Sequence, residues 1–227
     1  MLSTNLIGGR RQRSNYGADT MKELTIPIQD EAIRELKVGE PVTLTGIMIT
    51  GRDAVHKWLI DTFIKQTRTP EGDDAETYAA IKPILEGGVI YHCGPVVSGL
   101  DTGDYKFVAA GPTTSIREEP YQGDVMRHFN IKGVIGKGGM GAKTLQACQD
   151  VPGVYFHAVG GAASLIAQSV QKVLGVYKLS FGVPEAIWVL DVKNFPVVVT
   201  MDAHGNSLHA EIEGQSQKVL ERLLANT

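Results

Sequence analysis

Residues Gly133-Val-Ile-Gly-Lys-Gly-Gly-Met-Gly141, which continue into Ala142-Lys-Thr-Leu-Gln-Ala-Cys-Gln149, carry the clearest signal of the fold. An apolar run is followed by a glycine-rich turn and then by a segment with helical periodicity. This order predicts a strand, a tight turn and a helix. Strands that alternate with helices in this way are typical of an α/β protein.

The same alternation extends outward along the chain and then gives way to strands near its end. Strands are predicted at 24–28, 42–49, 89–92, 105–110, 154–159, 185–192 and 196–201. Helices are predicted at 30–36, 53–65, 124–129, 142–149, 162–174 and 215–224, with a further helix that ends at Leu85. The pattern favours one α/β domain with a mixed sheet and leaves the strand order open.

Composition excludes several classes of protein. The 227 residues carry a net charge of −3, which argues against general nucleic-acid binding, because that favours a basic face. No apolar stretch approaches the roughly 20 residues that a membrane helix needs. Two cysteines, Cys93 and Cys148, exclude a disulfide framework and cannot hold a metal cluster alone. A reducing, cytoplasmic setting is therefore expected.

The first twenty residues differ from the rest. They contain Arg10, Arg11 and Arg13, with no acidic residue before Asp19, and they lack the apolar core of a secretory signal. We interpret 1–20 as a disordered tail or an upstream start, and we expect the folded domain to span 21–227.

Three predicted strands end in turns that carry a cation. Thr50-Gly-Arg-Asp-Ala-Val-His56 follows strand 42–49, and Gly111-Pro-Thr-Thr-Ser-Ile-Arg117 follows strand 105–110. The third cation is Lys137 in the glycine-rich turn. Backbone amides at such turns bind anions, arginine offers a planar fork for a carboxylate, and lysine offers a compact charge. Together the three turns predict a pocket for a small, multiply charged acid.

The glycine-rich turn has competing interpretations. Gly136-Lys-Gly-Gly-Met-Gly141 satisfies the dinucleotide pattern G-x-G-x-x-G. A nicotinamide site also needs an acid at the end of the next strand, yet no acid lies between Asp150 and Glu185. A Walker loop is excluded because Lys137 precedes the glycines. An anion-binding loop and a tight turn with a solvated lysine both remain open.

Hydroxyl and imidazole groups near the turns are ambiguous from spacing alone. We expect one of Thr113, Thr114 and Ser115 to cap a helix, whereas a hydroxyl that moves a proton needs an activating base, and no base is evident. His56 is interpreted either as a first-turn contact or as a site residue. The histidines and cysteines match no zinc pattern, so no metal ligands are assigned.

Several ordered motifs together resemble one known family. They are Gly-Arg-Asp-Ala-Val-His (51–56), Cys-Gly-Pro (93–95), Gly-Pro-Thr-Thr-Ser-Ile-Arg (111–117), Gly-Lys-Gly-Gly-Met-Gly (136–141), Gly-Val-Pro-Glu-Ala-Ile-Trp (182–188) and Asp-Ala-His-Gly-Asn (202–206). Over roughly Met21 to Leu208 the chain resembles the β subunit, or C-terminal domain, of class I fumarate hydratases and L-tartrate dehydratases.

The resemblance implies a swivelling β/β/α domain and a separate α subunit, assembled as an αβ heterodimer or as (αβ)2. The α subunit would hold a [4Fe–4S] cluster on three cysteines, with one iron open to substrate as a Lewis acid. In this chain the resemblance implies Thr113 as the catalytic base. It implies Arg52, Arg117 and Lys137 as the residues that bind the carboxylates of a C4 dicarboxylate substrate. The neighbouring residues expected to support them are Asp53, His56, Thr114, Gly138 and Gly139.

The expected activity is the reversible dehydration of (S)-malate to fumarate. The first alternative is the dehydration of L(+)-tartrate to oxaloacetate, and the second is a stand-alone module that binds a carboxylate or phosphate without catalysis. The segment 67–85 looks longer than this connection usually is in the family, and it is expected to bear on the subunit interface or the pocket rim.

Overall fold

The computed structural model describes residues 21–225, so the tail predicted at 1–20 lies outside the described residues. Strands form a mixed sheet in the order β1-β2-β3-β6-β7-β9-β8. These strands are β1 (Lys22–Ile26), β2 (Pro41–Thr50), β3 (Val89–Tyr91), β6 (Gly133–Gly136), β7 (Val154–His157), β8 (Val170–Tyr177) and β9 (Ile187–Met201). The predicted α/β class with a mixed sheet is confirmed.

The sheet curls until it meets itself. Strand β2 pairs with β3 on one side and with β9 on the other, so β2, β3, β6, β7 and β9 form a closed ring. Neighbours from β1 to β7 run parallel, whereas β9 is antiparallel to β2, β7 and β8. A separate antiparallel hairpin is formed by β4 (Val96–Ser98) and β5 (Lys106–Ala109).

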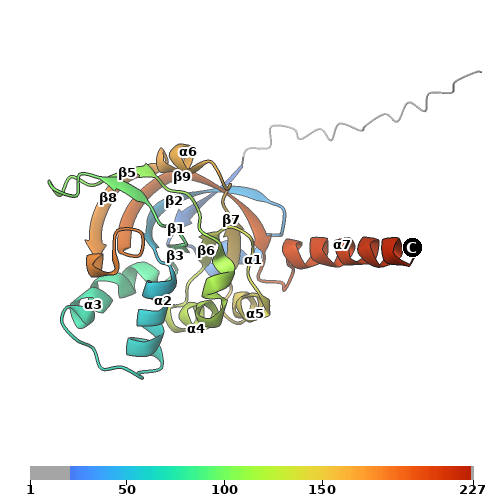
Figure 1. Ribbon diagram of the computed structural model, residues 1–227, viewed down its shortest axis with the longest axis horizontal. Helices are drawn as coiled ribbons and strands as arrows, with labels where there is room; N and C mark the ends of the chain where they lie inside the picture. Colours follow the sequence, from blue (N-terminus) through green and yellow to red (C-terminus); the bar gives the residue numbers. More distant parts are fainter. Residues whose placement is uncertain (1–20, 226–227) are drawn as a thin grey trace, which may run out of the picture.

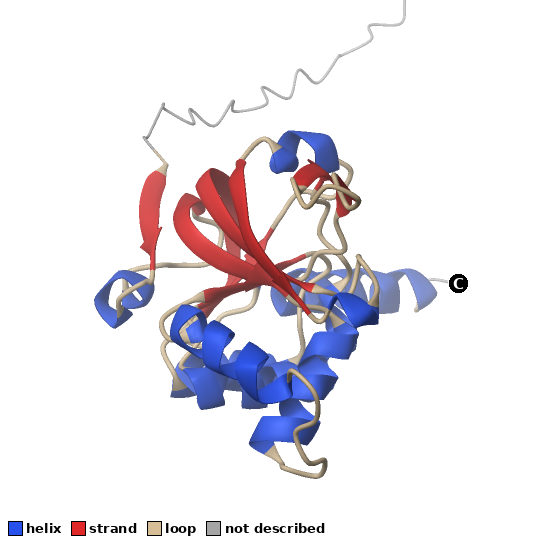
Figure 2. Ribbon diagram, turned by 90° about the vertical axis from the view of Figure 1, so that its left-hand side faces the viewer, coloured by secondary structure: helices blue, strands red, loops and turns tan. Residues whose placement is uncertain are grey.

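Helices cover one side of this sheet (Figures 1 and 2). The four on that side are α2 (Asp53–Leu59), α3 (Asp74–Leu85), α4 (Glu119–Phe129) and α5 (Ala142–Asp150). Helix α6 (Ala163–Ala167) lies near β5, and α7 (Leu208–Leu224) projects away from the body (Figure 1). The shorter elements are α1 (Asp30–Arg34), the π-helical turn η1 (Ile60–Ile64) and the 3-10 turns η2 (Ser115–Glu118) and η3 (Leu179–Phe181).

Alternation along the strands divides the core in two. Tyr91 and Phe156 pack into one cluster with the other inward-facing residues of the curled sheet, among them Trp188. Their sequence neighbours Ile90 and Tyr155 pack into a second cluster beneath the helices. Successive strand residues point to opposite faces, so one sheet supplies both cores.

The predicted helix at 162–174 is wrong beyond its first turns. Helix α6 ends at Ala167, and the chain continues as strand β8, which pairs with β9. Register shifts between Val170 and Lys172 and between Val173 and Gly175 interrupt the pairing. These irregularities remove the two-residue alternation and leave valines three residues apart, a spacing that resembles a helix.

Other boundaries also differ from the prediction. The predicted strands at 185–192 and 196–201 are one continuous strand, β9, which passes through Asn194 with φ +53°. Helix α4 begins five residues earlier than predicted, with Pro120 in its first turn, where proline is tolerated. Helix α7 begins at Leu208 because Ser207 caps it through a bond from the Ala210 amide. The short strand β4 was not predicted.

Among the described residues, no helix is long and apolar enough to cross a membrane.

The segment 67–85 is anchored by the buried carboxylate of Asp74. It accepts hydrogen bonds from Trp58 Nε1, Arg68 Nη2 and the Glu71 amide, each at 2.8 Å, and pairs with Lys178. Burial alone would raise the pKa of Asp74, but the bonds from Lys178, the Glu71 amide and Trp58 outweigh it and lower the pKa to about 2. This cluster ties α3 to α2 and to the turn after β8.

Replacing Asp74→Asn should lower the free energy of unfolding by about 3 kcal/mol at neutral pH, because it leaves the Lys178 ammonium without its buried partner. Asp74 binds protons less readily when folded, so its contribution should be lost as the pH falls from about 4 to about 2. Urea unfolding measures both effects. Asp104→Asn, which removes an exposed pair with Lys106, should cost less than about 0.5 kcal/mol. Equal losses would contradict this account.

Candidate functional site

The structure places the three cation-bearing turns side by side. Thr114 forms a parallel bridge with Lys137, in which the Lys137 amide donates to Thr113 O at 3.1 Å and the Ser115 amide donates to Lys137 O at 3.0 Å. Cys93 forms an antiparallel bridge with Pro112, next to Thr113. The turn after β5 therefore lies between the turns that follow β3 and β6.

Arg52 is held firmly at the start of α2. Its Nη1 lies 3.2 Å from Glu185 Oε1 and 3.4 Å from the carbonyl oxygen of Pro184, and its side chain is 19% exposed. A β-carbon on Gly94 would lie 2.5 Å from Arg52 Nη1, so only glycine leaves room for this guanidinium. Residues of two sequence motifs noted above, 93–95 and 182–188, thus surround the Arg52 guanidinium.

Arg117 and Thr113 lie in contact at the turn after β5. Arg117 Nη2 donates to Thr113 Oγ1 at 3.1 Å, and Arg117 Nη1 lies 3.7 Å from Asp53 Oδ2. Asp53 is the first residue of α2, so this ion pair joins the turn at 113–117 to the turn that carries Arg52. The guanidinium of Arg117 is about half exposed and can reach a ligand from this position.

The glycine-rich turn, which carries Lys137, forms the third side of the candidate site. Gly138 and Gly139 have φ values of +79° and +76°, in the left-handed region that favours glycine. A β-carbon on Gly139 would lie 2.6 Å from the ring of His209, which packs against the turn from α7. Lys137 is half-buried, and its stem passes Gly160 just beyond β7.

The expected helix cap at 113–115 is wrong. Thr114 occupies the N-cap position of η2 without a side-chain hydrogen bond, and Thr113 accepts from Arg117 instead. Ser115 is fully buried, with its hydroxyl turned into the interior. The backbone bridge to Lys137 pairs the amide of Ser115, the first residue of η2.

Behind the three turns runs a buried polar chain of five side chains: His56, Gln122, His92, Ser115 and Tyr155. Gln122 Oε1 lies 2.8 Å from Nε2 of both imidazoles. His92 Nδ1 lies 2.8 Å from Ser115 Oγ, and the Tyr155 hydroxyl donates to the same oxygen at 2.9 Å. His56 Nδ1 donates to the carbonyl oxygen of Arg52 at 2.9 Å.

These buried hydrogen bonds resolve the ambiguity over His56. Its imidazole is fully buried, and burial lowers its pKa. Burial, with His56 nearby, also holds the pKa of His92 well below its usual range. Both rings are therefore neutral, and His56 lies behind Arg52 as a structural contact. Sequence reasoning missed His92, Gln122 and Tyr155 as partners of Ser115 and His56, because no motif or spacing connects them.

Glu118 is an unusual carboxyl group at the end of η2. It is fully buried. Burial first, and then the charge of the neighbouring Asp53 and a hydrogen bond with that carboxylate, raise the pKa of Glu118 to about 8. Glu118 is consequently protonated at neutral pH, one residue away from Arg117.

The cysteines do not fit an iron–sulfur cluster. Cys93 and Cys148 are buried, and burial raises the pKa of each thiol to about 12, which disfavours the thiolate that binds iron. In the described part of the chain, no three histidine, cysteine or acidic side chains are grouped so that they could hold a metal ion.

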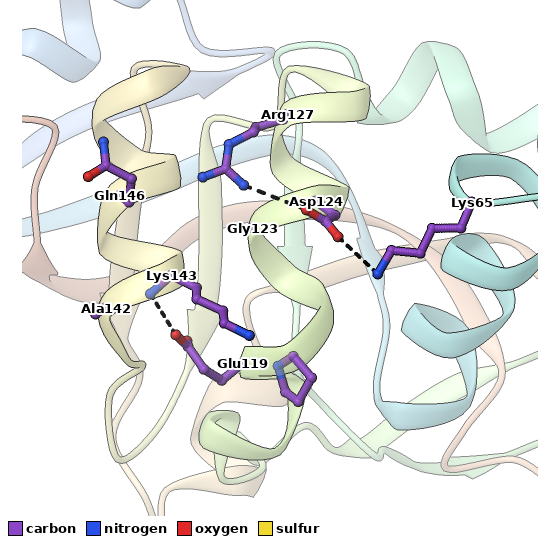
Figure 3. A pocket seen from close by; sticks show the side chains of 9 residues that line it. Lys65, Glu119, Gly123, Asp124, Arg127, Ala142, Lys143 and Gln146 are labelled. Atoms are coloured by element: carbon purple, nitrogen blue, oxygen red, sulfur yellow. Dashed lines mark hydrogen bonds and ion pairs between the residues drawn. The ribbon is translucent and has the colours of Figure 1, made fainter.

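A groove of 430 Å³ lies between α4 and α5 (Figure 3). Its charges pair with one another, since Asp124 lies 3.5 Å from Lys65 Nζ and 3.7 Å from Arg127 Nη1. Glu119 accepts bonds from the first amides of α5, including that of Lys143 at 2.9 Å. Apart from the Lys143 ammonium, the charged side chains of this groove are paired within the described part of the chain, so the groove is a weaker candidate for an anion than the three turns.

Residues 9–212 match the family model described as Fumarase C-terminus. The chain is 52% identical over 200 residues to a Geobacillus stearothermophilus protein named "Putative fumarate hydratase class I", covering 88% of this chain but only 35% of that relative. It is 36% identical to the L(+)-tartrate dehydratase subunit beta of Escherichia coli K12, covering 84% of this chain and 87% of the relative. A Methanocaldococcus jannaschii protein named "Putative L(+)-tartrate dehydratase subunit beta" is 37% identical, with coverages of 84% and 91%.

Glu118→Gln should flatten the dependence of stability on pH. The folded chain keeps the Glu118 proton up to about pH 8, whereas a glutamate in the unfolded chain loses it near pH 4.3. Across that window the unfolded state binds fewer protons, so wild-type stability should fall as the pH rises. Relative to Glu118→Gln, the wild type should lose roughly 2–4 kcal/mol between pH 5 and 8, at about 1.4 kcal/mol per pKa unit.

Urea unfolding at several pH values measures this difference. Glu76→Gln, which changes an exposed glutamate of α3, should give a curve parallel to wild type. Parallel curves for Glu118→Gln and wild type would instead mean that Glu118 is ionised when folded.

Proposed function

The chain belongs to the Fumarase C-terminus family, and from the geometry of its three turns we propose that it is the β subunit of a two-subunit hydro-lyase. In this proposal the assembled enzyme interconverts (S)-malate and fumarate by reversible dehydration. The name of the Geobacillus relative supports this substrate, because that relative shares 52% of its aligned residues with the chain. The chain supplies the groups that bind and orient the dicarboxylate.

The single observation that carries the proposal is the convergence of Arg52, Arg117 and Lys137 on adjoining turns. Each turn is joined to its neighbour by an interaction of the folded chain: the Asp53–Arg117 pair and the Thr114–Lys137 bridge. A C4 dicarboxylate has two charged ends, and three fixed cations can engage both. Their placement at turns, with backbone fixed by the sheet, limits the reorganisation that binding requires.

The chemistry of the proposed reaction suits these residues. Dehydration beside a carboxylate removes a proton from carbon and builds negative charge on that carboxylate. Cations aimed at this group stabilise the transition state more than the ground state. We assign the proton transfer to Thr113, because the hydrogen bond from Arg117 Nη2 stabilises negative charge on its oxygen. Its activating base is proposed to come from the partner subunit.

We further propose that the partner, an α subunit, carries the [4Fe–4S] cluster and forms αβ or (αβ)2 assemblies with this chain. Two relatives are named as subunit beta, which supports a partner of this kind. Exposed apolar side chains also occur in and near these segments of the chain, as a covered surface would require. Ile116 lies within the turn at 111–117, Val108 in the strand that leads into it, and Val159 just after β7.

The second candidate substrate is L(+)-tartrate, which would give oxaloacetate. It is favoured by a different observation, because the two relatives named for tartrate match most of their own length to this chain. Tartrate is also a C4 dicarboxylate, so the same three cations would serve it. The two candidates are separated by assay.

Anaerobic co-expression with the candidate α chain tests the function. Purified complex should form fumarate from (S)-malate, or oxaloacetate from L(+)-tartrate, and this chain alone should form neither. Complex formation with no turnover of either acid would contradict the proposal. Failure of the two chains to associate, together with dicarboxylate binding by this chain alone, would favour the stand-alone binding module.

In the complex, Arg117→Ala and Lys137→Ala should each lower kcat/KM roughly 30- to 5,000-fold, because a buried charged contact is worth about 2–5 kcal/mol. Arg127→Ala is a matched control, since it removes a partly exposed arginine that pairs only with acids along α4 and α5. It should change kcat/KM less than about twofold. A comparable loss in all three variants would point to general electrostatics.

Thr113→Ala should lower kcat at least roughly 100-fold while leaving assembly intact, because general acid–base catalysis contributes about that much or more. Thr113→Ser, which keeps the hydroxyl, should retain most of the activity. Steady-state kinetics and size-exclusion chromatography measure the two properties. Full activity of Thr113→Ala would remove Thr113 from the role of base.

A further inference from the structure

Resting on the proposed function, we propose that Ser115, His92, Gln122 and Tyr155 are positioning residues. They form a dry hydrogen-bonded chain that fixes the spacing of the three cation-bearing turns, although none of them belongs to the proposed substrate-binding set. All four residues are fully buried, each with 0% of its surface exposed.

Each turn is attached to this buried chain. At the first turn, His56 Nδ1 donates to Arg52 O, and its Nε2 meets the Gln122 amide. At the second, Ser115 itself belongs to the turn, and the Thr113 amide donates to His92 O at 2.7 Å. One continuous path of hydrogen bonds thus links the backbone of Arg52 to the backbone of Thr113.

The third turn is attached by close packing. A β-carbon on Gly136 would lie 1.8 Å from Ser115 Oγ and 3.0 Å from the Tyr155 hydroxyl. Gly136 therefore has no side chain because the Ser115 and Tyr155 hydroxyls occupy that space. Since Gly136 precedes Lys137, the position of the Ser115 hydroxyl bears directly on the start of the glycine-rich turn.

The protonation states of the two histidines determine which atoms donate and which accept along these buried hydrogen bonds. A neutral His56 that donates from Nδ1 to Arg52 O presents a lone pair at Nε2. An amide oxygen cannot satisfy that lone pair, whereas an amide nitrogen can. We therefore exchange the oxygen and nitrogen of the Gln122 amide, so that an NH2 group takes the place of Oε1 and donates to Nε2 of both His56 and His92.

The same logic continues to Ser115. Because His92 Nε2 accepts from Gln122, its Nδ1 carries the proton and donates to Ser115 Oγ. The Tyr155 hydroxyl donates to the same oxygen. Two donors from opposite parts of the core then fix the Ser115 hydroxyl in place, and through it residues 113–117.

Fixed spacing matters for the proposed reaction because displacement of a binding group by about 1 Å can cost roughly 100-fold in rate. Loss of the Ser115 hydroxyl should leave His92 Nδ1 and the Tyr155 hydroxyl without an acceptor, and the turns should shift or fluctuate. Groups that hold others in place in this way change the rate without touching the substrate.

The test compares three variants of the assembled complex. Ser115→Ala should lower kcat/KM roughly 10- to 100-fold, and Tyr155→Phe should lower it by a smaller factor. Thr144→Val is the matched control: it also removes a buried hydroxyl, which donates to Glu119 Oε2 at 2.7 Å, but it lies in α5, outside the buried chain. It should lower the melting temperature to a similar extent and change kcat/KM less than twofold.

A double variant tests whether Tyr155 acts through Ser115. If it does, Ser115→Ala with Tyr155→Phe should be no slower than Ser115→Ala alone. If the double variant instead loses kcat/KM by the product of the two single losses, Tyr155 does not act through Ser115. Tyr155→Phe by itself keeps the proposal testable if Ser115→Ala does not fold.

Hydrogen exchange on the full chain gives a readout that does not depend on activity. Amides of 113–117 and 136–139 should exchange at least roughly tenfold faster in Ser115→Ala and Tyr155→Phe, but not in Thr144→Val. If the wild-type complex turns over none of the C4 acids while exchange changes as expected, the proposed function fails and the positioning network stands. If the wild type is active and Ser115→Ala behaves like Thr144→Val in rate and exchange, the positioning network fails.

Discussion

Two backbone hydrogen bonds, from the Lys137 amide to Thr113 and from the Ser115 amide to Lys137, hold together everything else at the candidate site. They extend the sheet one step beyond β6 and join two turns that are far apart in sequence. Backbone groups buried at a strand end must find partners, and this short ladder provides them for the amides of Lys137 and Ser115. The hydroxyls of Thr113 and Ser115 make other contacts, with Arg117 and with the buried polar side chains.

Three cations on adjoining turns repel one another unless acids or ligands lie between them. In the folded chain, Glu185 pairs with Arg52 and Asp53 pairs with Arg117, which reduces this repulsion. The Arg52 pair is mostly buried and holds its guanidinium in place, whereas the Arg117 pair is long and half exposed. A substrate carboxylate can replace Asp53 at Arg117 at little cost, since exposed ion pairs contribute about 0–1 kcal/mol. In the proposed function, Arg52 would therefore be the fixed contact to the substrate and Arg117 the adaptable one.

Local signals in the sequence predicted the turns, the α/β class and the grouping of cations, because apolar runs that end in glycine and arginine mark strand ends. What failed depended on distant contacts. The closure of the sheet requires β9 to pair with β2, about 150 positions earlier in the sequence. Register shifts in β8 gave its sequence a helical spacing, so β8 was predicted as a helix. His92, Gln122 and Tyr155 come from three separate elements, so only the folded chain reveals that they share one path behind Ser115. The interpretation of 1–20 as a disordered tail or an upstream start stays a prediction, as does the expected effect of the segment 67–85 on the subunit interface or the pocket rim.

A crystal structure of the assembled complex with bound (S)-malate is the decisive measurement. We expect malate carboxylate oxygens within hydrogen-bond distance of the guanidinium groups of Arg52 and Arg117 and of the Lys137 ammonium, with Thr113 Oγ1 facing the carbon that loses its proton. Malate bound elsewhere, with Arg52 still paired to Glu185 and Arg117 to Asp53, would rule out this site.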